Sequence, residues 1–557
     1  MNRWLPKSVA CLADYSWQKF TSDLLAGITV GLVALPLAMA FAISSGVAPQ
    51  AGIYTAVVAG FLISALGGSK TQIGGPTGAF VVIIYGIVGT YGIDGLCMCT
   101  LMAGVILLLL GLTGLGTAVK YIPRPVIVGF TNGIAVLIAS TQIKDFLGLT
   151  IDKVPGEFVG RMEALATHLD TFSWRAALLA SVAVVVIVLC RRFVRRIPAY
   201  IVAMVMGTAF VAVTGYAVET VGSRFGGIPT GWPAFKMPTI DVNMIGALLP
   251  SAATVALLGA IESLLSAVVS DRMSGDKHNS NVELVAQGIA NIVSPFFGGI
   301  PATGAIARTA TNVRSGAKTP VAGMIHAVTL LCILLFAAPL ARFIPLSVLA
   351  AILLVVSYNM GEWHEIPKLL KLTWADISVW AITFGLTVFA DLTVAVGTGV
   401  VMAALLFIRK VTSTTTVMRV TPQYVEDGWL HILQGKPIPD YVAVFRIHGP
   451  FLFGANEKIS QVAECVAELP PIVILRLRNM TAIDATGLQA LEDLAEKCRH
   501  AGRTLILCGA PPQPARLMHQ AEFEQHVGKA NICADFHAAL ERAIVVNFNS
   551  GPGHRVA

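Results

Sequence analysis

The sequence predicts a polytopic α-helical membrane protein that ends in a small α/β domain. Three observations lead to this fold class. Of the 557 residues, 55% are hydrophobic and only 13% are charged, whereas soluble domains carry about 25% charged residues. Apolar runs close to the roughly 20 residues that cross a bilayer recur from residue 24 to residue 408. After Lys410 the sequence becomes polar, and strand-like runs alternate with helix-like runs.

Twelve apolar segments have the length expected of membrane spans. They are Leu24–Ile43, Ala51–Leu66, Leu96–Val119, Val126–Phe146, Trp174–Cys190, Ala199–Val221, Ile245–Ser270, Val282–Phe297, Val321–Ala341, Leu346–Met360, Ala375–Ala390 and Val394–Ile408. Two further segments, Gly74–Val88 and Gly298–Pro320, are rich in glycine and are broken by Pro76 and Pro301. Together these segments predict fourteen membrane passages.

The two glycine-rich segments are the third and the tenth of the fourteen, so they occupy matching places in two halves of seven. An odd number of segments per half inverts the second half, which predicts a 7+7 inverted repeat with a binding site near the bilayer midplane. The free N–H groups of the two short helices would face one gap and attract an anion. The alternative for residues 298–320 is a long cytoplasmic loop, but apolar runs flank the stretch closely on both sides.

Basic residues predict the orientation of the chain. An even number of segments places both termini on one side, and the positive-inside rule assigns the side with more Lys and Arg to the cytoplasm. The dense cluster Arg191–Arg196 and most other basic residues fall on the side of the N-terminus. Both termini are therefore expected in the cytoplasm. The formal net charge of +7 reflects this topology, so we expect a lipid bilayer and no nucleic acid as partner.

The expected domains follow from these changes in composition. Residues 1–22 form a cytoplasmic N-terminus, and residues 23–411 form the membrane domain, with repeats at about 23–221 and 244–411. A linker at 412–440, an α/β domain at 441–546 and a disordered tail at 547–557 follow. Strands alternating with helices in the α/β domain predict a small, largely parallel sheet.

Glu262 is the candidate for proton coupling. It lies halfway along an apolar segment that has no other charge before Asp271. A carboxylate at this depth must face a cavity or a partner. Burial opposes its ionisation and a nearby cation favours it, so such a group can bind and release protons during transport. A purely structural carboxyl group is the alternative.

Arg308 lies about one turn into the short helix of the tenth segment, which is predicted to start near Thr303. A guanidinium there can hold a carboxylate or sulfate in bidentate fashion, can balance Glu262, or can extend to the cytoplasm. Thr77 and Thr303 offer hydroxyl groups at the two helix starts, where they either meet the substrate or cap the helices.

The sequence contains no set of residues typical of covalent catalysis or of ATP binding. It lacks a Ser/His/Asp arrangement, an HExxH motif, a paired CxxC motif and a Walker motif. We therefore expect no enzyme, no catalytic residues, no metal site and no cofactor. Transport is expected to be driven by an ion gradient or by the substrate gradient.

The sequence resembles the SulP (sulfate permease) family of anion transporters from about Asp23 to Val546. The stretches that carry the resemblance are Asp23–Gly60, Gly259–Gly275 and Gly298–Pro320, and Ile483–Leu491 resembles part of a STAS domain. The resemblance implies a fold like that of uracil permease, in which segments 1–4 and 8–11 form a core and segments 5–7 and 12–14 form a gate. It also implies an elevator-like motion, a homodimer, and a cytoplasmic STAS domain that can bind a protein partner.

The resemblance further implies where the substrate binds. The substrate would lie between the starts of the third and tenth helices, so the expected substrate-binding residues are Phe41, Thr77, Gly78, Phe80, Thr303, Gly304, Ala305 and Arg308. The two aromatic residues have simple packing as their alternative role. Members with Glu at the place of Glu262 tend to use protons, so H⁺ is the expected coupling ion.

Within the family, the motifs around Glu262, Lys277–Leu284 and Phe296–Val313 resemble bacterial C4-dicarboxylate transporters. This resemblance implies proton-coupled uptake of succinate or fumarate across the bacterial inner membrane. The alternatives are transport of sulfate or bicarbonate, anion exchange without net proton movement, a nucleobase permease, and a sensor or scaffold that acts through the STAS domain.

Overall fold

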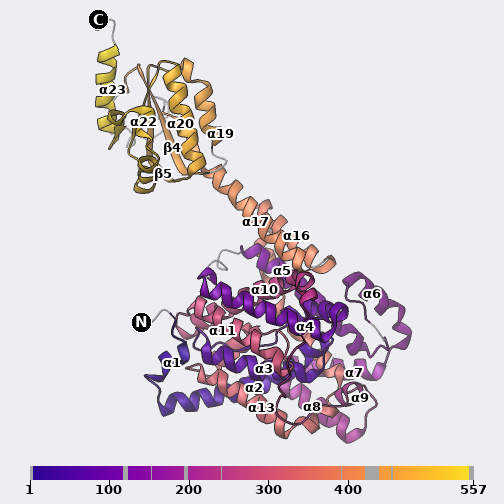
Figure 1. The fold of residues 1–557 in the computed structure, drawn as a ribbon. Helices are drawn as coiled ribbons and strands as arrows, with labels where there is room; N and C mark the ends of the chain where they lie inside the picture. Colours follow the sequence, from indigo (N-terminus) through magenta and orange to yellow (C-terminus); the bar gives the residue numbers. More distant parts are fainter. Residues whose placement is uncertain are drawn as a thin grey trace. The chain divides into compact units, whose positions relative to one another are not determined.

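The computed structural model describes residues 4–116, 123–151, 154–193, 198–239, 241–390, 392–420, 438–452 and 456–550. The chain divides into two compact units, Met1–Ala403 and Ala404–Ala557. The first unit is helical and the second contains an α/β domain (Figure 1).

The helices of the first unit follow the predicted segments closely. They are α1 Lys7–Leu12, α2 Trp17–Ser44, α3 Pro49–Leu66, η1 Gly78–Phe80, α4 Val81–Leu112, α5 Arg124–Leu147, α6 Phe158–Thr167, η3 Leu169–Thr171, α7 Trp174–Phe193, α8 Ala199–Thr214, α9 Val221–Phe225, η4 Val242–Met244, α10 Ile245–Ser274, α11 Ser280–Val293, η5 Ser294–Phe297, α12 Ile306–Arg314, α13 Val321–Phe336, η6 Ala338–Phe343, α14 Leu346–Met360, η7 Trp363–Glu365, α15 Ile366–Leu369, α16 Trp374–Phe389 and α17 Leu392–Thr414, which continues into the second unit. Among the described residues, seven helical stretches are long and apolar enough to cross a membrane, and α8, α13 and α16 are shorter apolar helices.

Helix α4 contains two of the predicted segments. Gly92 interrupts it with φ 69° and ψ −169°, which are not helical values. Glycine adopts a positive φ at little cost because it lacks a Cβ atom. The break separates the predicted third segment, Gly74–Val88, from the predicted fourth segment, Leu96–Val119, whose last three residues lie outside the described part. All fourteen predicted segments therefore have a helical counterpart in the described part of the chain.

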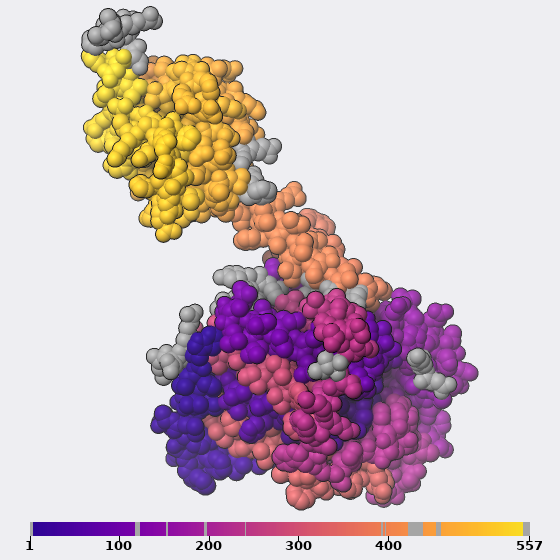
Figure 2. All heavy atoms as spheres, in the orientation of Figure 1, coloured from indigo at the N-terminus to yellow at the C-terminus, as the bar shows by residue number. Residues whose placement is uncertain are grey.

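The helices form two bundles, and each contains segments from both halves of the membrane domain. In the core bundle, α2, α3 and α4 pack against α10, α11, α12 and α13. In the gate bundle, α5, α7 and α8 pack against α14, and α5 also packs against α16. Figure 2 shows purple and salmon atoms, from the first and second halves, interleaved on the visible face of the helical unit. The packing agrees with the expected division into core and gate.

A short antiparallel pair of strands joins the two broken segments inside the core bundle. Strand β1, Gly74–Gly75, lies beside β2, Thr303–Gly304, with Gly74 opposite Gly304. The third and tenth segments therefore meet through their backbones just before each helix begins. Because Thr303 and Gly304 are extended, helix α12 starts at Ile306, three residues later than predicted.

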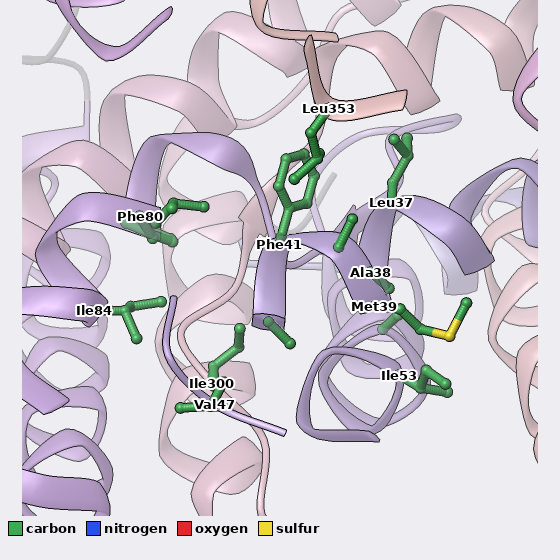
Figure 3. Packing of buried hydrophobic residues seen from close by; sticks show 14 of the residues in the cluster. Leu37, Ala38, Met39, Phe41, Val47, Ile53, Phe80, Ile84, Ile300 and Leu353 are labelled. Carbon is green, nitrogen blue, oxygen red and sulfur yellow. The ribbon is translucent and has the colours of Figure 1, made fainter. Parts of the chain in front are cut away.

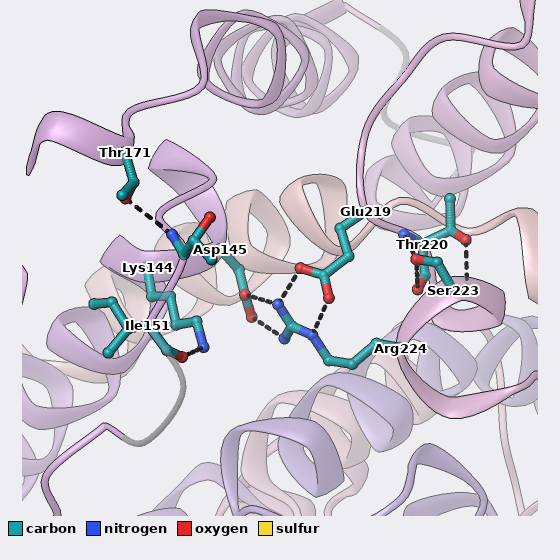
Figure 4. Close-up of polar contacts among 9 residues, drawn as sticks. Lys144, Asp145, Ile151, Thr171, Glu219, Thr220, Ser223 and Arg224 are labelled. Atoms are coloured by element: carbon teal, nitrogen blue, oxygen red, sulfur yellow. Dashed lines mark hydrogen bonds and ion pairs between the residues drawn. The ribbon is translucent and has the colours of Figure 1, made fainter. Parts of the chain in front are cut away.

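Arg224 forms ion pairs with two carboxylates, those of Asp145 and Glu219, at one end of the gate bundle (Figure 4). Arg224 donates from Nε to Glu219 at 2.6 Å and from Nη2 to Asp145 at 2.7 Å. Burial alone would lower the pKa of Arg224, but the hydrogen bonds to Glu219 and Asp145 outweigh it and raise that pKa. The arginine stays charged, and it ties α5 and α9 to the segment between α8 and α9.

The second unit contains a five-stranded sheet in the order β3-β4-β5-β6-β7. The strands are β3 Thr416–Arg419, β4 Val442–Phe451, β5 Ile472–Ile483, β6 Thr504–Cys508 and β7 Ile532–Cys533, and the helices are α19 Asn456–Glu464, α20 Ala485–His500, α21 Pro512–Gln520, α22 Glu524–Val527 and α23 Phe536–Ser550, with η9 Val466–Glu468 and η10 Lys529–Asn531. Only β3 is antiparallel to its neighbour; β4 to β7 are parallel, as predicted. Apolar residues of α20 pack against one face of the sheet and those of α23 against the other.

Two domain boundaries differ from those expected. Strand β3 lies within the predicted linker 412–440, of which residues 421–437 lie outside the described part. Helix α23 continues to Ser550, so residues 547–550 of the predicted tail are helical. The remaining residues of that predicted tail, 551–557, lie outside the described part.

Candidate functional site

The predicted site lies where η1–α4 and α12 begin, next to the β1–β2 pair. The first N–H groups of a helix have no partner within that helix. In α12 the first internal bond runs from the Thr309 N–H to the Ala305 carbonyl, 2.8 Å away. The N–H groups of residues 306–308 precede it. Two such helix starts, joined through one pair of strands, provide N–H donors for an anion.

Side chains from neighbouring helices hold the irregular backbone before α12. The backbone N–H groups donate to small polar side chains: Ile300 to Thr55 (2.7 Å), Ala302 to Asn291 (2.8 Å) and Gly304 to Ser263 (3.0 Å). Irregular backbone at membrane depth requires such partners because lipid offers none. The sequence prediction did not include these residues. Their only sequence signal is a small polar side chain within an apolar segment.

Arg308 is buried beneath the start of the third segment. Its side chain is only 2% exposed, so it does not extend to a surface. Its Nη2 atom donates to the Pro76 carbonyl, while Nη1 has no hydrogen-bond partner in the described part of the chain. A Cβ atom on Gly75 would lie only 2.7 Å from Nη1. The guanidinium group is thus fixed at the site and retains donor capacity for a ligand.

Glu262 is linked to the same helix start by a hydrogen bond. Thr77, the N-cap residue of η1, makes no capping bond and instead donates from Oγ1 to Glu262 at 2.9 Å. The charges of Glu262 and Arg308 are close enough to interact. They form no ion pair within 4.0 Å among the described residues. The structure therefore brings the predicted proton site and the predicted anion site to one helix start.

Three of the predicted substrate-binding residues make contacts within the core bundle. The Thr303 hydroxyl donates to the Gly259 carbonyl at 3.0 Å and lies 2.7 Å from the Ser263 hydroxyl. The Gly304 N–H donates to Ser263, and the Ala305 N–H donates to the Ile73 carbonyl at 2.8 Å. These groups position the start of α12.

Apolar side chains from both bundles meet at Gly78. A Cβ atom there would lie 2.8 Å from Ile138, 3.2 Å from Phe41 and 3.4 Å from the Met360 sulfur. Ile138 and Met360 belong to gate helices α5 and α14, and Phe41 belongs to core helix α2. Phe41 and Phe80 are buried in one apolar cluster (Figure 3). The sequence offered no signal for the two gate residues, because apolar residues are ordinary in apolar segments.

Two of the cavities between the bundles differ greatly in size. The larger, about 830 Å³, is lined by residues 82–91 of α4, by residues 154–158 and by the end of α16. The smaller, about 40 Å³, lies beside Glu262 between α5, α10 and α12. The interface is therefore wide along the first half of α4 and narrow beside Glu262.

Comparison with known families identifies the chain. Residues 20–383 match the family described as the Sulfate permease family. The chain belongs to this family. Residues 436–539 match the STAS domain, as the sequence predicted. Members of this family are anion transporters, so the protein is an anion transporter.

Full-length relatives and a solved structure support this assignment. This chain is 42% identical over 518 residues to YvdB of Bacillus subtilis (strain 168), a protein named for sulfate transport. The alignment covers 92% of this chain and 96% of YvdB. This chain is also 32% identical over 546 residues to the bicarbonate transporter BicA of Synechocystis sp., covering 95% of each chain. The solved structure of SLC26A9 superposes with a TM-score of 0.86 at 19% identity, covering 97% of this chain and 93% of that one.

The structural likeness confirms the predicted fold class: a helical membrane transporter with a C-terminal STAS domain. The finer resemblance to the C4-dicarboxylate transporter DauA stays a prediction, because YvdB and BicA are named for sulfate and bicarbonate.

Proposed function

We propose that this protein is a secondary transporter that moves a small oxyanion, of the sulfate or bicarbonate class, together with protons. The observation that carries the proposal is the hydrogen bond from Thr77 to Glu262. It links a carboxyl group to the helix start that also binds Arg308 through Pro76. An anion and a proton bound at this place would act on each other directly.

The physical basis of anion binding is the sum of several modest terms. A helix start contributes about 0.3–1 kcal/mol to an anion, and up to about 2 kcal/mol when it is partly buried. The two helix starts and the guanidinium group of Arg308 would all attract an anion bound between those helix starts. Ile138 and Met360 press against Gly78 from the gate and limit the space there, which favours a small anion.

Coupling to protons follows from the charge of Glu262. An ionised Glu262 repels an anion bound at the helix start of Thr77, whereas the protonated carboxyl group does not. Anion and proton binding therefore favour each other, as reciprocal linkage requires. The core bundle contains both helix starts, Arg308 and Glu262, so its displacement against the gate would carry both ligands. Because anion and proton would move together, an inward proton gradient would drive uptake of the anion.

Uptake into proteoliposomes that contain the full-length protein tests the proposal. Labelled sulfate, bicarbonate and succinate are supplied with and without an inward proton gradient, so the dicarboxylate predicted from the sequence is tested in the same panel. We expect accumulation of one of these anions to require the gradient. Accumulation that is indifferent to the gradient would contradict proton coupling.

The variant Glu262→Gln tests whether Glu262 is the residue that couples proton movement to anion transport. Glutamine imitates the protonated carboxyl group, so the variant should exchange anion at equal pH yet lose gradient-driven accumulation by at least about tenfold. Glu163→Gln is the matched control, because Glu163 is an exposed carboxylate on α6. If Glu262→Gln accumulates anion as the wild type does, Glu262 has a structural role only.

A further inference from the structure

A second carboxylate, on the gate bundle, lines the small cavity beside Glu262. Glu362 follows the end of α14 and contributes to the wall of this cavity of about 40 Å³. The other lining residues come from α5, α10 and α12 and are apolar except for Thr131. Glu262 and Glu362 are the two titratable groups among these lining residues. One belongs to the core and the other to the gate.

The backbone holds Glu362 in an unusual conformation. Its φ of 43° and ψ of 36° are left-handed, a region that residues with a Cβ atom rarely adopt and that Gly and Asn favour. Neighbouring contacts maintain it: Asn132 donates to the Gly361 carbonyl, and the Glu365 N–H donates to the Glu362 carbonyl at 2.8 Å. Backbone requirements alone would therefore select a different residue at this place.

The charged groups near this turn are engaged elsewhere. Glu365 binds Arg124 of α5 at 2.5 Å, Lys368 at 2.7 Å and His364 at 3.2 Å. On α12, Arg308 donates to the Pro76 carbonyl. Within the described residues the Glu362 carboxylate has neither an ion pair nor a side-chain hydrogen bond. Glu362 and Glu262 are the two ionisable residues that line this mostly apolar cavity.

We propose that Glu362 exchanges protons with Glu262 across the interface between core and gate. The proposal rests on the proton coupling proposed above and adds the group that receives the proton. The O–H bond of the Glu262 carboxyl group breaks and an O–H bond forms on the Glu362 carboxylate, so one negative charge passes from Glu362 to Glu262. A cavity of about 40 Å³ has room for a water molecule, which can accept one proton and donate another.

The placement of the two groups makes this transfer depend on the position of the core. Glu262 moves with the core, whereas Glu362 stays with the gate. The two carboxyl groups share a cavity only while the core occupies the position seen here. Proton release from Glu262 is thereby tied to one end of the transport movement, which prevents protons from leaking at the other end.

Substitutions at Glu362 separate a proton-transfer role from a backbone role. Glu362→Gln keeps the shape of the side chain, Glu362→Asn suits the left-handed backbone better, and Glu362→Asp keeps the carboxylate. Each full-length variant is reconstituted with an entrapped pH dye, and proton uptake on addition of anion is compared with anion exchange at equal pH. Glu163→Gln is the control, and thermal unfolding of each variant is recorded.

We expect Glu362→Gln and Glu362→Asn to lose proton uptake by at least about a hundredfold, the lower end of the range for loss of a proton-transfer group. Their anion exchange should stay close to that of the wild type, and Glu362→Asp should restore proton uptake in part. Full proton uptake by the Gln and Asn variants would overturn the inference. An equal fall in exchange and in proton uptake would also overturn it, since a structural role predicts that result. If the wild type itself takes up no protons, the proposed coupling fails and this inference fails with it.

Discussion

Gly75 determines where the buried Arg308 guanidinium can lie. Its φ of 147° falls in a region that residues with side chains rarely adopt. A Cβ atom there would also lie 2.7 Å from Arg308 Nη1 and 3.5 Å from the Ala56 Cα atom. The absence of a side chain at Gly75 therefore leaves room for the Arg308 guanidinium at the proposed anion site.

Gly75→Ala should lower anion exchange in proteoliposomes by at least about tenfold, since about 1–3 kcal/mol of backbone strain adds to the displacement of Arg308. Initial rates of labelled-anion exchange measure the effect. Gly86→Ala is the matched control, because Gly86 lies on the same segment with no atom within 4 Å of an added Cβ. Exchange at the wild-type rate in Gly75→Ala would contradict this prediction, because it would show that anion exchange does not require the Arg308 guanidinium at its present position.

The same residues show which parts of a site can be predicted from a sequence. Glu262 and Arg308 were predicted because a charge in an apolar segment is costly and needs a reason. Ile138 and Met360 were not predicted, since nothing in an apolar segment shows which side chain will meet a distant glycine. Thr303 was predicted as a hydroxyl at a helix start, yet its hydroxyl bonds to α10, because β2 displaces the start of α12 to Ile306.

Among the elements, the two broken segments were the most predictable. Gly and Pro at matching places of two halves indicated interrupted helices, and the β1–β2 pair now joins them. The details depend on other elements, however, because side chains of α3, α10 and α11 satisfy the backbone before α12. Such partners come from helices that are distant in sequence, so their identity required the folded structure.

A carboxylate on the core bundle helps to hold helix α1 in place. Asp276, in the loop between α10 and α11, lies 2.7 Å from Lys7 of α1 and 3.5 Å from Lys70. Partial burial raises the pKa of Asp276, but the hydrogen bonds from Lys7 and the Lys277 N–H and the charges of Lys7 and Lys70 outweigh it and hold the pKa below its ordinary value. The ionised form of Asp276 is thus favoured by folding.

The stabilisation from Asp276 should disappear in acid. Because its folded pKa lies below the unfolded value of about 3.9, the pair stabilises the protein above that pH and ceases to do so as the pH falls through the folded pKa. Asp276→Asn should therefore unfold more easily at pH 7, by about 0.2–1 kcal/mol for a partly exposed pair, and should approach the wild type only as the pH falls below the folded pKa of Asp276. Thermal unfolding across this range measures the difference.

A control is available at Asp14, whose side chain is 94% exposed and pairs with Lys19. Asp14→Asn should leave the unfolding temperature unchanged both at pH 7 and in acid. A destabilisation of Asp276→Asn that persists unchanged in acid would mean that Asp276 acts through its shape or its neutral hydrogen bonds and not through its charge.

For the whole molecule, the division into core and gate links the fold to transport. Each bundle combines helices from both repeats, so the membrane segments of one repeat are shared between the two bundles. The sequence indicated the repeats through their matching broken segments. The assignment of helices to two bundles came from the family resemblance, because periodicity within a segment does not reveal its neighbours. The core contains the proposed anion site and Glu262, and the gate contributes Ile138, Met360 and Glu362.

If the core moves against the gate, a bridge between them should stop transport, whereas a bridge within the core should not. Ile306 of α12, Phe130 of α5 and Leu258 of α10 all line the small cavity. In a protein whose nine cysteines are replaced, the pair Ile306→Cys and Phe130→Cys would join core to gate through a short bifunctional thiol reagent. We expect anion exchange to fall by at least about tenfold, as for an arrested conformational step, and to recover on reduction.

The pair Ile306→Cys and Leu258→Cys joins two core helices and should retain exchange after the same treatment. Undiminished exchange in the first pair, with complete cross-linking verified by mass spectrometry, would show that transport needs no displacement between the two bundles.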